Sequence, residues 1–186
     1  MKEYNMTDAQ IIDGYITMME ERVFGGWEPY LITLMFNQLT GNEQTKQRQM
    51  LKECEIVYAR LLTRLIKRPH NTPTEQMPFW ISCFDWPVNK REKAALPDIL
   101  TNDGMHVHAF FMVPPNAKTG DRLGDIVARS PKSFLVGEGM SLARLHVEPI
   151  EKTAPRAALY TLKQVPRKRM TSADILVLPK SQSELI

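Results

Sequence analysis

The stretch Tyr30-Leu31-Ile32-Thr33-Leu34-Met35-Phe36 is an apolar run of β-branched and aromatic residues with the length of a single strand. Gly25-Gly26 separates this run from a helical pattern on its N-terminal side. A second helical pattern follows the run along the chain. We therefore expect residues 30–36 to form the central strand of a sheet on which helices pack.

Two amphipathic helices are predicted on either side of this strand. Thr7-Asp8-Ala9-Gln10 has the composition of a capping box, and apolar residues follow at helical spacing as far as Val23, which predicts a helix over about 7–23. A longer helix is predicted between residues 42 and 67 and should end before Pro69. Its apolar residues recur three and four positions apart: Met50, Leu51, Cys54, Val57, Tyr58, Leu61, Leu62 and Leu65.

The remaining chain predicts further strands and two shorter helices. Strands are expected over 79–86, 105–113 and 142–150, with a polar insertion from 87 to 104. Short helices are expected near 124–129 and, after Pro155, over about 156–163, and a last strand near 174–178.

This order of elements predicts an α+β fold. Strand, helix, strand, strand, connection, strand and helix suit one central antiparallel β-sheet with helices packed on one face. That is a ferredoxin-like or RRM-like (βαββαβ) topology. At 186 residues the chain fits a single domain over 1–186, with a C-terminal tail over about 170–186.

Composition places the chain among globular proteins, with 43% hydrophobic and 24% charged residues. The N-terminus lacks the apolar core of a signal peptide, and no stretch approaches the roughly 18 apolar residues of a membrane helix. We therefore expect a cytoplasmic protein without a membrane partner.

Cys54 and Cys83 lie far apart in apolar surroundings, which favours buried thiols over a disulfide or a cysteine metal site. No phosphate-binding loop of the G-x-x-x-x-G-K type is present, so no ATP-driven motor is expected.

The net charge of +3 is small, but the basic residues are unevenly distributed. Between Lys152 and Arg169 the chain carries no acidic residue. This pattern is typical of a surface that binds a polyanion, and a solvated helix face is the alternative. The basic residues of the run are Lys152, Arg156, Lys163, Arg167, Lys168 and Arg169.

His106-Val107-His108 lies within a predicted strand, so the two imidazoles should point to the same face of the sheet. Imidazole is the commonest metal ligand, and a rigid strand can present two such ligands without ordering a loop. The alternative is a pair of partly buried histidines without a metal. Burying two such side chains without partners is costly, which favours the metal interpretation.

Tyr160 lies three residues before Lys163 on a predicted helix, so the two side chains should share one helical face. A phenol is a poor nucleophile near neutral pH and needs a cation or a metal beside the phosphate that it attacks. Lys163 and the metal could meet that need. Taken alone, Tyr160 would be interpreted as a core tyrosine at helical spacing.

Together, the strand at 30–36, the pair Gly104-Met105-His106-Val107-His108 and Tyr160-Thr161-Leu162-Lys163 resemble the three ordered motifs of the HUH endonucleases. This superfamily contains rolling-circle replication initiators, relaxases and single-strand transposases. The resemblance covers about three quarters of the chain. It is closest to the single-tyrosine initiators, whose third motif is Y-x-x-K.

The resemblance implies a role for each matching residue. His106 and His108 would bind a divalent metal, Mg²⁺ or Mn²⁺, Tyr160 would be the nucleophile, and Lys163 would orient the metal or the phosphate. In the family the third ligand often lies on the strand before the histidines, which here indicates Asp85. The alternatives for this ligand are Asp98, Asp103 and Gln164, the last of which would match the Y-x-x-x-Q pattern of the transposases.

The function implied is nicking and strand transfer of single-stranded DNA, at an origin or a hairpin, through a covalent 5′-phosphotyrosine, as in rolling-circle replication of a plasmid, phage or mobile element. A host helicase is a possible further partner. We expect DNA across the open sheet face, with its phosphates held by Arg156, Lys163, Arg167, Lys168 and Arg169.

Two alternatives stay open: a single-strand transposase of the same superfamily, and a non-catalytic RRM-like nucleic-acid-binding module. A histidine-triad nucleotide hydrolase is disfavoured, because Phe110 stands where its third alternating histidine would be.

Overall fold

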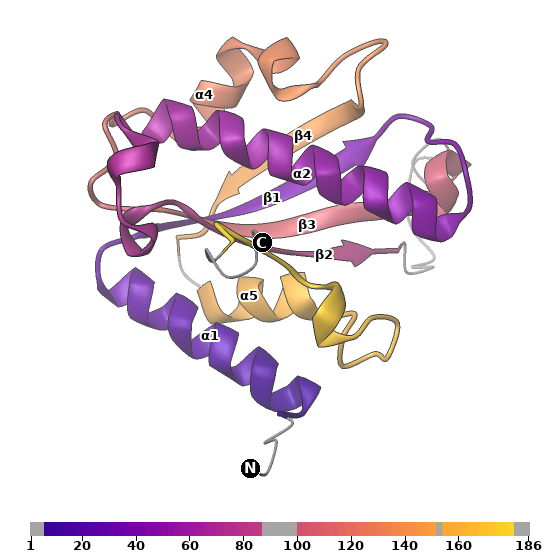
Figure 1. Cartoon of the computed structure of the whole chain (residues 1–186), viewed down its shortest axis with the longest axis horizontal. Coiled ribbons are helices and arrows are strands. Elements are labelled where there is room, and N and C mark those ends of the chain that lie inside the picture. Colours follow the sequence, from indigo (N-terminus) through magenta and orange to yellow (C-terminus); the bar gives the residue numbers. More distant parts are fainter. Residues whose placement is uncertain (1–5, 87–99, 152–153, 181–186) are drawn as a thin grey trace.

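Strands of the computed structural model form one antiparallel sheet in the order β4-β1-β3-β2-β5 (Figure 1). The structure describes residues 6–86, 100–151 and 154–180. Strand β3 occupies the middle of the sheet, whereas β1, which we expected there, is its neighbour on the β4 side. The strands are β1 (Glu28–Phe36), β2 (Phe79–Asp85), β3 (His106–Val113), β4 (Leu142–Pro149) and β5 (Leu176–Leu178).

Helices cover both faces of this sheet, which corrects the prediction that they pack on one face. Helices α2 (Glu43–Leu65) and α4 (Leu123–Arg129) lie on one side, and α1 (Asp8–Phe24) and α5 (Ala154–Leu162) lie on the other (Figure 1). Helix α1 packs mainly on α5 and hardly on the sheet, so it forms an outer layer on that side. The sequence pattern showed that α1 has an apolar side but not which element covers it.

Alternation along the strands separates an apolar face from a face that carries polar side chains. On the side of α2, the buried residues Ile32, Leu34, Val107 and Phe111 contribute to the core. Trp80 also lies in this core, where its ring packs edge-on against Phe111. The opposite alternation places Thr33, Asp85, His106 and His108 beneath α5. One sheet therefore supplies both the core and a polar site.

Helix boundaries agree with the sequence patterns to within a few residues. The capping box at the start of α1 is present, with the Thr7 hydroxyl accepting from the Gln10 backbone N–H and the Gln10 side chain accepting from the Thr7 backbone N–H.

Cys54 and Cys83 are buried free thiols, as expected, and burial raises the pKa of Cys83 to about 12. Among the described residues, no helix has the length and apolar character needed to cross a membrane.

Candidate metal centre

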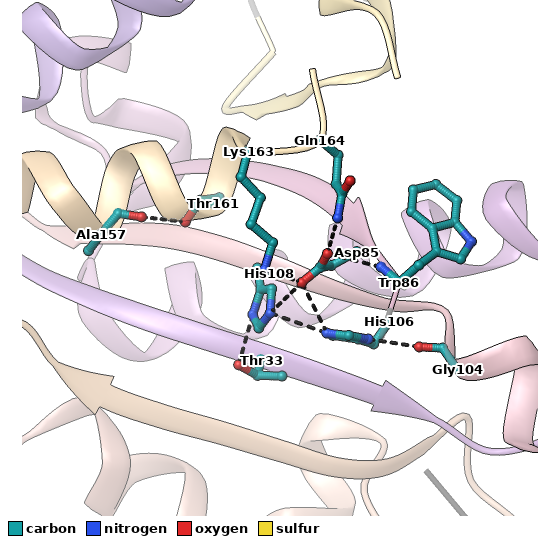
Figure 2. A network of polar contacts seen from close by, with 10 residues as sticks. All are labelled: Thr33, Asp85, Trp86, Gly104, His106, His108, Ala157, Thr161, Lys163 and Gln164. Atoms are coloured by element: carbon teal, nitrogen blue, oxygen red, sulfur yellow. Dashed lines mark hydrogen bonds and ion pairs between the residues drawn. The ribbon is translucent and has the colours of Figure 1, made fainter. Parts of the chain in front are cut away.

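Three potential metal ligands converge on the α5 side of the sheet: Asp85, His106 and His108 (Figure 2). In the antiparallel register of β2 and β3, Asp85 lies opposite His106, and Cys83 lies opposite His108. The two histidines alternate on β3, so both imidazoles project to the same side as the carboxylate. One ligand atom from each residue can be chosen such that all lie within 4.8 Å of one another.

The Nδ1 atom of each imidazole already has a partner. His106 Nδ1 lies 2.9 Å from the Gly104 carbonyl oxygen, and His108 Nδ1 lies 3.0 Å from Thr33 Oγ1. With hydrogen on both Nδ1 atoms, each ring donates to its oxygen partner and keeps a lone pair on Nε2. Such contacts commonly orient histidine ligands and select their tautomer.

Both Nε2 atoms face the Asp85 carboxylate. His106 Nε2 lies 3.6 Å and His108 Nε2 lies 3.2 Å from Asp85 Oδ2, and the two Nε2 atoms are 3.2 Å apart. In the tautomers described above, these three atoms are all acceptors, and converging lone pairs repel unless a cation lies between them. Two imidazoles and one carboxylate are ligands that Mn²⁺ and Zn²⁺ accept readily. The donor set therefore fits a divalent metal ion.

Asp85 is buried and has two further partners from the segment after α5. Lys163 Nζ lies 2.5 Å from Asp85 Oδ2, and the Gln164 side-chain amide donates to Oδ1. Burial raises the pKa of Asp85, but the contacts of the carboxylate with the two imidazoles, the Lys163 ammonium group and the Gln164 amide lower it by more. The net effect holds the pKa of Asp85 well below the usual carboxylate value, so this ligand is ionised near neutral pH.

His108 is the more buried of the two histidines. Burial lowers its pKa, the contact with Asp85 raises it, and the charges of His106 and Lys163 lower it, so that the net pKa lies below the usual histidine value. A metal ligand must be unprotonated. As the pH falls, protons should therefore compete with a metal ion for His108 only at a lower pH than they would for an exposed histidine.

Tyr160 projects beside this group, at the last turns of α5. Its ring centroid lies 5.0 Å from that of His108, and Lys163 Nζ lies 3.7 Å from the centre of the Tyr160 ring. Tyr160 is 44% exposed, in contrast to the buried Tyr30 and Tyr58. An exposed phenol, a cation and a three-ligand group thus meet at one place.

The other candidate site residues from the sequence lie outside the three-ligand group. Asp103 is exposed and pairs with Lys46 at 3.2 Å, so it is not part of the three-ligand group. Gln164 is buried next to Asp85, and its Oε1 has no partner among the described residues. Asp98 and Lys152 lie outside the described residues. The remaining basic residues, Arg156, Arg167, Lys168 and Arg169, are exposed in and after α5.

The sheet face that carries the site is only partly open, which corrects the expectation of DNA across an exposed face. Helix α5 and the segment after it cover β2 and β3. On the neighbouring β1, Leu31, Thr33 and Met35 are half-buried, and on β4 Arg144 and His146 are exposed. A strand of nucleic acid at the site would therefore have to run along the β1–β4 side.

Sequence reasoning missed two features that hold the histidines. Thr33 contacts His108 from the adjacent strand, and its signal was a hydroxyl within an otherwise apolar run. Asn102, Asp103 and Gly104 all have positive φ, at 53°, 57° and 73°. Buried Asn102 secures this tight turn by donating to the carbonyl of Asn37 and accepting from the Leu39 N–H. The turn directs the Gly104 carbonyl oxygen towards His106. In the sequence, the only sign of this turn was the pair Asp103-Gly104.

The assignment of Asp85 as the third ligand predicts that Asp85→Asn weakens Mn²⁺ binding strongly. The substitution keeps the shape of the side chain but removes the only carboxylate among the three ligands, so the Kd should rise about a hundredfold or more. The matched variant Asp103→Asn should change the Kd by less than about twofold, because that exposed side chain pairs with Lys46. Titration calorimetry measures both. Equal Kd values for the two variants would remove Asp85 from the ligand set.

The contact between Thr33 and His108 predicts a positioning role for the hydroxyl group. Thr33→Val has nearly the same shape but cannot accept from Nδ1, so the Mn²⁺ Kd should rise about ten- to a hundredfold. Thr33→Ser retains the hydroxyl and should restore most of the affinity. Nitrogen chemical shifts of His108 in metal-free protein report the tautomer directly, and an unchanged tautomer in Thr33→Val would contradict this role.

Comparisons with protein-family models, with curated proteins and with solved structures found no match to this chain. What the structure establishes is an α+β protein with a five-stranded antiparallel sheet in its described part, and a buried Asp-His-His group that could bind a metal ion.

Proposed function

We propose that the protein is an endonuclease of the HUH type that nicks and rejoins single-stranded DNA through Tyr160. The observation that carries the proposal is the position of Tyr160, an exposed phenol whose ring lies 5.0 Å from that of the candidate ligand His108. A core tyrosine would be buried, and a surface tyrosine of no function need not lie next to a group of potential metal ligands. Besides Tyr160 and the candidate metal ligands, the proposal involves Lys163, which contacts both Tyr160 and Asp85.

Asp85, His106 and His108 would hold one divalent ion, Mg²⁺ or Mn²⁺, which would supply Lewis-acid stabilisation of charge on the scissile phosphate. Ionised Asp85 provides the negative charge of this ligand set, and Gly104 and Thr33 keep the two Nε2 atoms directed inward. Mg²⁺ prefers oxygen ligands, so the two imidazoles favour Mn²⁺ as the more tightly bound of the two ions.

Tyr160 Oη would attack the phosphorus atom in line with the bond to the 3′ oxygen. The Oη–P bond forms as the P–O3′ bond breaks, and the phenolic proton is transferred, directly or through water, to the 3′ oxygen that leaves. The 5′ phosphate stays on Tyr160. Attack by another 3′ hydroxyl reverses the step and rejoins the strand, so no ATP is consumed.

Lys163 would assist this step through two contacts. Its ammonium group lies over the Tyr160 ring and pairs with Asp85, so it adds positive charge where the phenolate and the phosphate would meet. Its contact with Asp85 also fixes the carboxylate before a metal binds. The Y-x-x-K pattern thus corresponds to a spatial arrangement and not only to a spacing in sequence.

The fold is compatible with the proposal. The elements β1, α2, β2, β3, α4 and β4 follow the β-α-β-β-α-β order of a ferredoxin-like domain. Arg156 lies on α5, the helix that carries Tyr160, and Arg167, Lys168 and Arg169 follow this helix; all four are exposed and would hold phosphates near Tyr160.

One observation favours a second candidate, a single-strand transposase of the same superfamily. Gln164 lies four residues after Tyr160, is fully buried and contacts Asp85, and its Oε1 has no partner among the described residues. Rotation of this amide would turn an oxygen towards the metal centre and make Gln164 a further ligand, as the Y-x-x-x-Q pattern implies. The identity of the DNA that is cut, an origin or a transposon end, separates the two candidates.

The proposal is tested by incubating the protein with a pool of labelled single-stranded oligonucleotides and Mn²⁺. We expect a protein–DNA adduct that survives denaturation and that is absent when a chelator is added. Mass spectrometry of the digested adduct should place the nucleotide on Tyr160. DNA binding without any adduct across a pool that samples hairpins and random sequence would favour the non-catalytic RRM-like module instead.

A further inference from the structure

A second basic region lies on the side of the sheet away from the metal centre. Between Glu55 and Glu75 the chain carries no acidic residue, and its basic residues fall at the C-terminal half of α2 and just beyond. These residues are Arg60, Arg64, Lys67 and Arg68. Helix α2 packs on the face opposite to α5, so this region and the exposed Tyr160 lie on different sides of the molecule (Figure 1).

The segment after α4 forms a second wall beside this part of α2. Arg60 donates to the carbonyl of Ser133, and Lys118 Nζ donates to the Thr63 carbonyl at 2.7 Å. These contacts hold residues 118 and 129–134 against the helix. Two shallow hollows, of about 390 and 430 Å³, lie along this junction, and Arg64 lines both. Arg129 lines the first hollow and Lys132 the second. Lys67 and Arg68 follow directly after the helix and line another hollow. We call this surface, from Arg60 to Arg68 and from Arg129 to Lys132, the basic groove.

Most of the charge in the basic groove is not neutralised by the protein. Arg129 pairs with Asp121 at 2.5 Å. In the part of the chain that the structure describes, Arg64, Lys67, Arg68 and Lys132 have no acidic partner, and the side chains of all four are exposed. Cations near a helix C-terminus stabilise the helix, which explains Arg64 but not the cations contributed by the other wall. Unpaired cations on one wall and unpaired Lys132 on the other give this surface a positive charge that attracts polyanions.

The groove lacks the aromatic surface that single-stranded nucleic acid requires. Phe134 lines one hollow but is fully buried, and the exposed large hydrophobic residues of the described chain all lie outside the groove. Proteins that bind single strands combine a basic track with aromatic side chains on which bases stack. A duplex has its bases stacked internally, so its backbone phosphates can be held by cations without aromatic side chains.

We propose that the basic groove binds double-stranded DNA through its phosphates, independently of the metal centre. The single strand proposed for the Tyr160 side and the duplex would then occupy opposite sides of the sheet. Binding should depend strongly on salt, because cations that contact phosphates release counterions from the DNA, and it should be insensitive to sequence, because every nucleotide has the same phosphate. The proposal does not depend on nuclease activity.

Fluorescence anisotropy with a short blunt-ended duplex of arbitrary sequence tests this proposal on the whole protein. A chelator in the buffer removes divalent metal ions, so that metal-dependent DNA binding or cleavage does not contribute to the signal. The test variant is Arg64→Gln combined with Lys132→Gln, because both side chains are exposed and neither has a hydrogen bond or ion pair within the described residues. The matched control is Arg48→Gln with Lys52→Gln, the same change of charge on the exposed N-terminal half of α2.

We expect the groove variant to bind the duplex about tenfold or more weakly than the parent. Its slope of log Kd against log salt should fall by about two, one for each lost phosphate contact. The control variant should stay within about twofold of the parent. Binding of a single-stranded oligonucleotide of the same length should be the same for the groove variant and the parent.

Three results would overturn the proposal. Equal losses in the groove and control variants would show diffuse attraction instead of a site. An equal loss for single strands would make the groove a single-strand track. A parent protein that binds phosphatidylserine vesicles but not the duplex would assign the groove to a lipid surface. Circular dichroism melts confirm that each variant is folded before these comparisons are made.

Discussion

Replacing Tyr160 with phenylalanine should abolish the adduct between protein and single-stranded DNA while leaving DNA binding within about twofold of the parent. The substitution removes only the phenolic oxygen, and the ring can still pack beside His108 and beneath Lys163. Loss of a nucleophile typically lowers the rate by a factor of a thousand to a million or so. The adduct is measured on denaturing gels with Mn²⁺, and binding by anisotropy with the metal chelated.

Other tyrosines of the chain provide the controls for this result. Tyr58 is buried, with its hydroxyl donating to the Pro78 carbonyl at 2.9 Å, and burial raises its pKa. Tyr30 is also buried and donates to Glu28. Neither of these tyrosines is exposed as Tyr160 is, and neither lies beside the three-ligand group. An adduct that persists in Tyr160→Phe, or that maps to another tyrosine, would show that the nucleophile is wrongly assigned.

Substitution of both His106 and His108 by glutamine should remove metal binding and cleavage together. Glutamine preserves polarity and approximate size but is a weak ligand, and two of the three candidate ligands are lost. The Kd for Mn²⁺ should rise by more than about a hundredfold, and adduct formation should fall below detection. Titration calorimetry and the gel assay measure the two effects on one preparation.

A matched control uses the two histidines outside the site. His70 and His146 are exposed, and neither belongs to the three-ligand group. The variant His70→Gln with His146→Gln should therefore bind Mn²⁺ as the parent does. If the His106→Gln and His108→Gln variant is folded and binds Mn²⁺ as tightly as this control, the histidine pair is structural and the proposed nuclease has no metal centre.

Local patterns in the sequence were sufficient to predict the main elements. Apolar runs rich in β-branched and aromatic residues predicted the strands, and the spacing of apolar residues with a capping box predicted α1 and α2, because these signals depend only on neighbours along the chain. Alternation on β3 was also sufficient to place His106 and His108 on the same side. Tyr160 and Lys163 lie one turn apart, so their proximity was likewise a local property.

Contacts between distant segments were not predictable from the residues alone. The position of each strand in the sheet depends on how the apolar surfaces of the elements pack against one another. The same packing decides that α1 and α5 cover the face opposite to α2 and α4. The proximity of Asp85 to His106 required the register of β2 against β3, and a shift of one residue would have turned Asp85 to the other face. The sequence ranked Asp85 above Asp103 and Gln164 only by resemblance to a family.

The sequence by itself therefore determined the elements, the histidine pair and the spacing of Tyr160 and Lys163, because each follows from the geometry of one helix or one strand. Only the tertiary structure decided that Asp85, Thr33 and Gln164 surround that pair, and that Asp103 pairs with Lys46 instead. These contacts join residues far apart in the chain. They form where the burial of apolar surface brings strands and helices together, and local sequence patterns do not encode that arrangement.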